Sequence, residues 1–150
     1  MHIKTKIPPP LVALTFGFLI NYTKDIFPKI DIRNQIIFGS FMIIIGLIII
    51  LFAIMLFKKY QTTITPLNPS KATKLITDGI YKFSRNPMYL GLLFVLFGIS
   101  IILNPIGGLF LIPIFILYLN LFQIIPEENA MVDLFKGEFL EYKENVRRWI

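Results

Sequence analysis

The residues with the strongest potential for chemistry gather where a polar loop meets a strongly apolar segment. The stretch from Gly79 to Gly91 reads GIYKFSRNPMYLG and contains an arginine, two tyrosines and an Asn-Pro pair. Asn is a favoured N-cap residue and Pro a favoured first residue of a helix, so Asn86 and Pro87 predict a helix start. The backbone N–H groups of such a start bind anions. The sequence therefore predicts an anion-binding helix end with Arg85 beside it.

The first turn of this helix should supply its donors from the backbone. We expect the amide groups of Met88, Tyr89 and Leu90 to be free of intrahelical acceptors. Tyr81 and Tyr89 add aromatic rings next to Arg85. Each of these residues alone would be typical of a membrane anchor or an interfacial belt, and only their combination favours a functional site.

A pair of carboxyl groups, Glu127-Glu128, follows the last apolar segment directly. Two carboxyl groups at a membrane boundary are costly unless they are solvated or paired. Acids in the first turn of a helix also complement its dipole, so a structural role is equally open for each glutamate alone. Convergence with Arg85, Tyr81 and Arg148 on the same rim favours function.

Composition limits the class of protein. The chain has 150 residues, 55% of them hydrophobic, with 15 Phe and a mean hydropathy of +0.71. This apolar content exceeds what a soluble domain of that size can bury, so part of the surface must face lipid. There is no Cys and the single His is His2, which disfavours thiolate sites, zinc and Ser-His-Asp chemistry. The net charge of +6 comes from basic residues that lie between the apolar segments and form no nucleic-acid-binding motif. These residues suit lipid headgroups better than nucleic acid.

The hydrophobic segments predict an all-α membrane protein with about four transmembrane helices in a single domain, residues 1–150. A bilayer span needs ~20 apolar residues. The third and fourth segments should form a tight hairpin that turns at Asn104-Pro105, and the first should remain as a helix rather than be removed as a signal peptide. The four segments are Pro8–Tyr22, extended as far as Phe27 at most, Gln35–Phe57, Pro87–Leu103 and Ile106–Ile125.

Charge predicts the orientation. If both termini and the Lys58–Arg85 loop share one side, the other side holds only Lys24, Lys29 and Arg33. The positive-inside rule then places both termini and the predicted site at the cytoplasmic face. The tail after Pro126 has apolar residues near helical spacing, interrupted at Gly137, which predicts a cytoplasmic cap of two short amphipathic helices. Asn120 and Gln123, at membrane depth, should face inward, to a cavity or to another helix.

These motifs resemble the isoprenylcysteine carboxyl methyltransferase and phospholipid methyltransferase family of integral membrane enzymes. The resemblance rests on the Gly79–Gly91 motif, the apolar hairpin, the Glu-Glu pair, the Phe-x-Gly-Glu-Phe-x-x-Tyr segment Phe135–Tyr142, and Val-Arg-Arg-Trp-Ile at Val146–Ile150. It implies S-adenosylmethionine as cofactor, bound at the cytoplasmic rim between the hairpin and the C-terminal helices, and no metal. Two residues depart from the family pattern: Asn86 stands where the isoprenylcysteine enzymes have His, and Arg147 stands where Pro is common.

The resemblance and the chemistry of the side chains together predict the site. Arg85, Glu128 and Arg148 are expected to act in catalysis. The carboxylate of the cofactor needs a helix end, its ammonium and hydroxyl groups need hydrogen-bond acceptors, and its adenine needs an aromatic wall. The predicted cofactor-binding residues are Tyr81, Asn86, Pro87, Met88, Tyr89, Leu90, Glu127, Glu128, Phe135 and Tyr142.

The function expected from the resemblance is methyl transfer to a hydrophobic or amphiphilic acceptor that enters from the bilayer. A hydrophobic small molecule, a lipid or a lipidated partner would fit, and the accepting atom stays open between carboxylate, thiol and amine. The alternatives are a phospholipid amine N-methyltransferase and a non-catalytic membrane scaffold or transporter subunit. A transporter would place charges within the spans, and the predicted spans contain none.

Overall fold

The computed structural model describes residues 7–61 and 73–150, and the regular elements of these parts are all helical. The prediction of an all-α fold is confirmed. The elements are α1 (Pro9–Tyr22), α2 (Gln35–Lys59), the 3-10 helix η2 (Gly79–Lys82), α3 (Pro87–Leu103), α4 (Pro105–Leu119), the π-helical turn η3 (Asn120–Ile124) and α5 (Ile125–Asn145).

Two helical stretches are long and apolar enough to cross a membrane, namely α2 and the continuous stretch Pro105–Asn145. The helices α1 and α3 are apolar but shorter. Along α2, large side chains such as Ile37, Phe41 and Leu51 are more than half exposed. Soluble monomers rarely expose a continuous apolar face of this size, so the chain is a membrane protein.

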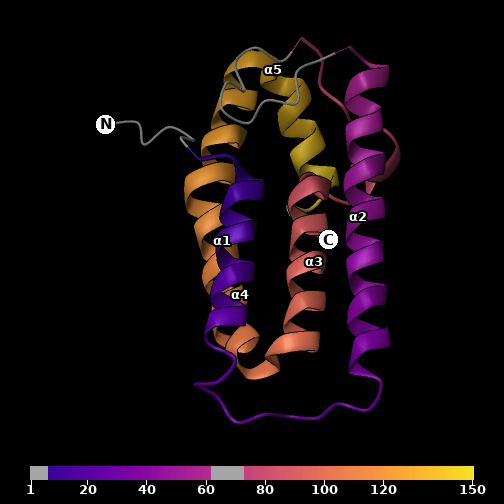
Figure 1. Cartoon of the computed structure of the whole chain (residues 1–150). Coiled ribbons are helices and arrows are strands. Elements are labelled where there is room, and N and C mark those ends of the chain that lie inside the picture. Colours follow the sequence, from indigo (N-terminus) through magenta and orange to yellow (C-terminus); the bar gives the residue numbers. More distant parts are fainter. Residues whose placement is uncertain (1–6, 62–72) are drawn as a thin grey trace.

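The helix α3 lies at the centre of the bundle and contacts α1, α2 and α4. Figure 1 shows that α1 and α3 run in one direction and that α2 and α4 run in the other. The starts of α1 and α3 and the ends of α2 and α4 therefore point toward one end of the bundle, where α5 lies. The residues predicted to form a site belong to this end.

Glycines bring α2 and α3 into close contact. A Cβ on Gly46 would lie 2.5 Å from the carbonyl oxygen of Gly91, and a Cβ on Gly91 would lie 2.6 Å from that of Gly46. Gly39 and Gly98 face each other in the same way, one heptad away on each helix. Small residues at such positions let two helix backbones approach closely, which fixes their register.

This register leaves a recess over the start of α3. From the Gly46–Gly91 contact, α2 continues for thirteen residues to Lys59, whereas α3 has only four residues before Gly91, starting at Pro87. At ~1.5 Å per residue, the end of α2 extends ~14 Å beyond the start of α3. The free space above the start of α3 is thus bounded on one side by the last turns of α2.

The tight hairpin between α3 and α4 turns at Asn104, as predicted. Its Oδ1 accepts from the Gly107 amide at 2.8 Å and caps α4, and its Nδ2 donates to the Ile20 carbonyl oxygen at 3.2 Å. The second predicted segment ends two residues before α2 does, at Lys59, and the fourth starts one residue after α4 does, at Pro105. The helix α1 ends at Tyr22, without the extension toward Phe27.

The predicted fourth segment, Ile106–Ile125, corresponds to α4 and η3, and the helix continues from there into α5 without a break. Pro126 has no N–H donor, and the π-helical turn before it, with the Ile125 amide bonded to the Asn120 oxygen, lets the helix continue. The break in the tail falls at Lys136, with φ 46° and ψ −119°, one residue before the predicted Gly137. The second half of α5 then folds back toward the start of α3 (Figure 1).

Candidate functional site

The start of α3 forms where it was predicted, but its donors differ from those expected. The Asn86 side chain does not cap the helix, because its Nδ2 donates to the Arg148 carbonyl oxygen at 3.0 Å. The Leu90 amide donates to the Asn86 carbonyl oxygen at 3.0 Å, so the prediction that Leu90 is a free donor is wrong. The amides of Met88 and Tyr89 remain as the open donors of the first turn.

Arg85 is the centre of a polar cluster next to this helix start. Its side chain is only 8% exposed, and its Nη1 donates to the carbonyl oxygens of Lys143 at 3.0 Å and Val146 at 2.6 Å. Its Nη2 donates to Glu128 Oε1 at 2.8 Å. Its Nε is buried and has no hydrogen-bond partner within the described residues. Since an unpaired buried donor costs about 1–3 kcal/mol, this N–H suits a ligand acceptor.

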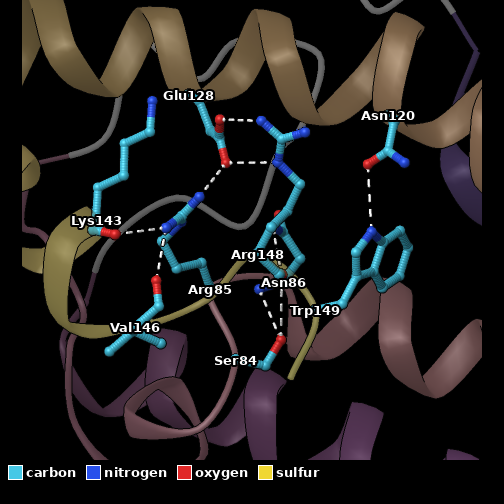
Figure 2. Close-up of polar contacts among 9 residues, drawn as sticks. All are labelled: Ser84, Arg85, Asn86, Asn120, Glu128, Lys143, Val146, Arg148 and Trp149. Carbon is cyan, nitrogen blue, oxygen red and sulfur yellow. Dashed lines mark hydrogen bonds and ion pairs between the residues drawn. The ribbon is translucent and has the colours of Figure 1, made fainter.

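Glu128 joins two arginines. Arg148 donates from Nε to Oε1 at 3.0 Å and from Nη2 to Oε2 at 2.7 Å, while Arg85 shares Oε1 (Figure 2). Burial alone would raise the pKa of Glu128, but the hydrogen bonds from Arg148 and Arg85 and their charges outweigh it and hold the pKa below its usual value. Glu128 is therefore an ionised link between the two arginines.

The same cluster fastens the end of the chain, Val146–Trp149, which we name the C-terminal strap. The Arg85 amide donates to the Arg147 carbonyl oxygen at 3.1 Å. Figure 2 shows that Trp149 Nε1 donates to Asn120 Oδ1, at 3.3 Å. The strap thus lies against the start of α3. Asn120 faces inward to another segment, as predicted, and so does Gln123, whose Nε2 donates to the Ile7 carbonyl oxygen at 2.8 Å.

Glu127 lies in a different environment from its neighbour Glu128. Its Oε1 accepts from the Tyr89 hydroxyl at 2.5 Å, and it makes no ion pair within residues 7–61 and 73–150. Burial raises the pKa of Glu127 to about 7, and the charge of Glu128 adds to the rise, while the hydrogen bond from Tyr89 acts in the opposite direction. Near neutral pH, Glu127 is thus divided between its two protonation states.

Two tyrosines tie α5 to η2. The Tyr142 hydroxyl donates to the Tyr81 carbonyl oxygen at 2.6 Å, and the Tyr81 ring packs edge-on against Phe57 with ring centroids 5.8 Å apart. Burial raises the pKa of both tyrosines above the usual value, so both hydroxyls stay protonated. Each tyrosine therefore presents an aromatic surface with a fixed orientation.

These groups surround a cavity of about 320 Å³ in the recess over the start of α3. Its volume falls within the range of ~300–1,000 Å³ typical of ligand sites. Arg85, Tyr89 and Glu127 provide polar groups at the wall. The wall is otherwise mainly apolar, and its members include Pro9, Pro10, Ile50, Ile54, Phe57, Leu75, Ile76, Met131 and Phe139.

Three of the predicted site residues do not line the cavity. Leu90 is buried, Phe135 packs in the apolar cluster around Phe139, and Arg148 holds Glu128. The structure brings the other predicted site residues together, because the cavity is lined by Tyr81, Arg85, Asn86, Pro87, Met88, Tyr89, Glu127, Glu128 and Tyr142.

The sequence does not predict the apolar wall. Ile50, Ile54 and Phe57 come from α2, which is apolar on all faces and so gives no periodic signal for the side that meets a cavity. Their spacing of about one helical turn is the only sequence feature that could have shown that they share a face. For metals, the described residues contain no group of His, Cys, Asp or Glu suited to hold an ion.

Comparison with known proteins gives consistent matches. The model of the phospholipid methyltransferase family matches residues 34–138. The chain is 33% identical over 112 residues to protein-S-isoprenylcysteine O-methyltransferase A of Arabidopsis thaliana, covering 73% of this chain and 55% of that protein. It is 36% identical over 76 residues to the Saccharomyces cerevisiae protein-S-isoprenylcysteine O-methyltransferase, covering 48% of this chain and 30% of the relative.

An uncharacterized protein of Haemophilus influenzae is 44% identical over 64 residues, covering 42% of this chain and all of that protein. The chain spans about half the length, or less, of the named methyltransferases that it matches. No solved structure is significantly similar to it. Because the family model covers more than two thirds of the sequence and includes the helix start, the Glu-Glu pair and α2, the chain belongs to the phospholipid methyltransferase family.

Proposed function

We propose that this chain is an integral membrane methyltransferase that takes a methyl group from S-adenosylmethionine and transfers it to a hydrophobic or amphiphilic acceptor. The cavity over the start of α3 carries the proposal, since it combines open N–H donors, a carboxyl group and a long apolar wall. Membership of the family and relatives named as O-methyltransferases support it. A scaffold or transporter subunit would not require this combination of groups.

The donors at the cavity suit the carboxylate of the cofactor. The buried, unpaired Nε of Arg85 and the open amides of Met88 and Tyr89 would hold it, since charged acceptors bind well at a helix N-terminus. The rings of Tyr81 and Tyr142 offer a surface for adenine. S-adenosylmethionine, when bound, would supply a methyl group on a sulfonium sulfur, which leaves as a neutral thioether.

Glu128 and Arg148 act as positioning residues in this proposal. Both oxygens of Glu128 are engaged by the two arginines, and this link fixes the guanidinium of Arg85 at the cavity wall. The C-terminal strap and the apolar walls exclude water from the reacting groups. Alignment and exclusion of water are the main contributions a protein makes to such a transfer.

The apolar wall supplied by α2 favours an acceptor with a hydrophobic chain. Ile50, Ile54 and Phe57 follow one another along the last turns of α2, so a chain could lie beside them with its polar end near Glu127. An isoprenylcysteine carboxylate and a phospholipid amine are both candidates. Asn86 stands where the isoprenylcysteine pattern has histidine, so the phospholipid amine stays a candidate.

Transfer to lipid-soluble acceptors tests the function. Membranes that contain the wild-type chain should convert methyl-labelled S-adenosylmethionine into label extractable by organic solvent. Arg85→Ala should reduce the rate by roughly 100-fold, the size expected when a reactant is misplaced by about 1 Å. Lys82→Ala, an exposed position on η2, is the matched control and should keep the wild-type rate. Equal transfer in membranes without the chain, or an unchanged rate in Arg85→Ala, would contradict the proposal.

We also propose that α1, α2, α3 and the helix from Pro105 all span the membrane, with the site at the cytoplasmic face. The bundle arrangement in Figure 1 and the excess of Lys and Arg at the site end support this orientation. In intact cells, Lys29→Cys should react with an impermeant thiol reagent, whereas Lys143→Cys should react only after lysis. The chain has no native cysteine to interfere. Labelling of Lys143→Cys from outside would reverse the orientation.

A further inference from the structure

A second hollow lies between α2 and η2, apart from the cavity over the start of α3. It is a groove of about 600 Å³, which we name the outer groove. None of the described residues lines both hollows. The described lining of the outer groove is apolar except for one lysine and consists of Phe52, Met55, Leu56, Lys59, Gly79, Ile80 and Phe83.

The outer groove and the cavity lie on opposite sides of α2. Ile54 belongs to the cavity wall and Leu56 to the outer groove. Because an α-helix turns by about 100° per residue, these two side chains point in directions about 200° apart. In η2, Tyr81 lines the cavity while its neighbour Ile80 lines the outer groove. The end of α2 and η2 therefore form a partition between the two hollows.

Gly79 allows the two walls of the outer groove to meet. Its φ of 58° lies in the left-handed region that favours glycine, and a Cβ there would lie 3.0 Å from Leu56 Cδ1. Beside this contact, Phe52 and Met55 belong to α2, and Phe83 follows η2. The outer groove is thus a hollow between two elements that touch, rather than a flat helix face.

The apolar part of the outer groove is exposed to the membrane. Phe52 and Met55 belong to α2, which is long and apolar enough to cross a bilayer, and both are more than half exposed. Phe83 is 75% exposed. Water in such a hollow would lack hydrogen-bond partners, and an empty hollow would lose packing contacts. A hydrocarbon chain supplies these contacts, so the groove fits an acyl chain of a lipid.

The polar end of the outer groove carries positive charge. Lys59 lines the groove and Lys58 precedes it in the last turn of α2. Both are exposed, and neither makes an ion pair within the described residues. Asp78 lies close enough for its charge to interact with Lys59, but it already accepts the Tyr60 hydroxyl. Two lysines beside one acid leave an excess of positive charge, which attracts anionic headgroups.

We propose that the outer groove binds one anionic phospholipid, with its phosphate at Lys58 and Lys59 and an acyl chain beside Phe52, Met55 and Phe83. The lipid fills the space between α2 and η2 and holds η2 against α2. The inference goes beyond the proposed function and does not depend on it, since this lipid is bound and not methylated. Phosphatidylcholine carries the same phosphate together with a cation, so it gains less from the two lysines.

Native mass spectrometry of the purified chain with equal amounts of phosphatidylglycerol and phosphatidylcholine tests the selectivity. The wild type should retain one phosphatidylglycerol, roughly tenfold more often than phosphatidylcholine. The double variant Lys58→Gln/Lys59→Gln should lose most of this preference. The matched control, Lys24→Gln/Lys29→Gln, removes two exposed lysines near the start of α2 and should keep it.

A second pair of variants tests the acyl-chain part of the outer groove. Phe83→Ala should reduce the bound phosphatidylglycerol by about threefold or more, because it removes apolar surface from the groove. Phe38→Ala is the control, since Phe38 is 55% exposed at the other end of α2. It should bind the lipid as the wild type does.

Hydrogen exchange locates the effect of the lipid. The amides of Phe83 and Ser84 donate to the Ile80 carbonyl oxygen, and the Tyr81 amide donates to that of Asp78. In nanodiscs of phosphatidylcholine, adding phosphatidylglycerol should slow exchange in the peptide 79–84 by roughly threefold or more, because a ligand of the closed form disfavours opening. The double variant Lys58→Gln/Lys59→Gln should show no such slowing.

Equal retention of the two lipids, an equal loss of preference in the Lys24→Gln/Lys29→Gln control, or unchanged exchange in the peptide 79–84 would each overturn the proposal. Unchanged binding in Phe83→Ala would restrict the lipid to the lysines and contradict the groove as its site. A dimer that excludes the lipid, visible in the same spectra, would assign the outer groove to a second copy of the chain instead.

Discussion

A chain that ends at Gly137 should lose S-adenosylhomocysteine affinity by roughly 100-fold or more while its helices still insert into the membrane. The missing part supplies Phe139 and Tyr142 to the cavity wall and the carbonyl oxygens of Lys143 and Val146 to Arg85. Removing partners from a buried charge costs about 3–5 kcal/mol, enough to displace the Arg85 guanidinium. The measurement is isothermal titration calorimetry in detergent with S-adenosylhomocysteine.

The control for this truncation removes only Ile150, whose side chain is 71% exposed. That variant should bind as the wild type does. If the chain ending at Gly137 is well folded and keeps its affinity, the tail is only an anchor and the cavity does not depend on the C-terminal strap.

Glu128→Gln should be the most destabilising single substitution at the site, by about 3–5 kcal/mol, because it removes the negative charge between two arginines. Gln keeps the size of the side chain but cannot accept from both Arg85 and Arg148 as an anion does. The C-terminal strap should then detach, and limited proteolysis should cleave the chain near Asn145 more rapidly.

The stability that Glu128 contributes should depend on pH. The folded-state pKa of Glu128 is lowered, so its contribution to stability is present above the usual value of 4.5 and is lost as pH falls through the lower folded-state pKa. The melting temperature of the wild type at pH 7 should therefore be higher than that of Glu128→Gln. The difference between the two melting temperatures should become smaller as the pH is lowered. Glu138→Gln, an exposed neighbour, should match the wild type, and an equally stable Glu128→Gln would show that the link is not structural.

Helix starts could be predicted from the sequence where the chemistry of single residues decides them. Pro87 and Pro105 each fix the first turn of a helix, and Asn104 caps the second, so both boundaries depend on local preferences. The sequence predicts that Arg85 and the Glu-Glu pair lie on the same side of the membrane, because two predicted spans separate them along the chain. The neighbourhood of the site was therefore predictable.

The roles within that neighbourhood depend on tertiary contacts that no local pattern records. Glu127 and Glu128 are identical in type and adjacent, yet one meets two arginines and the other a tyrosine. Similarly, the break at Lys136 falls on a residue that disfavours positive φ, although Gly137 is next to it. The second half of α5 contacts η2 through Tyr142 and Tyr81, and no local pattern in the sequence records this contact.

The most direct measurement of the central claim is a calorimetric titration of the purified wild-type chain, in lipid nanodiscs, with S-adenosylhomocysteine. The account predicts saturable binding at one site per chain, with affinity reduced at least tenfold in Arg85→Ala and unchanged in Lys82→Ala. No saturable binding to a folded wild-type chain, or equal affinity in Arg85→Ala, would contradict the assignment of the cavity over the start of α3 as the cofactor site.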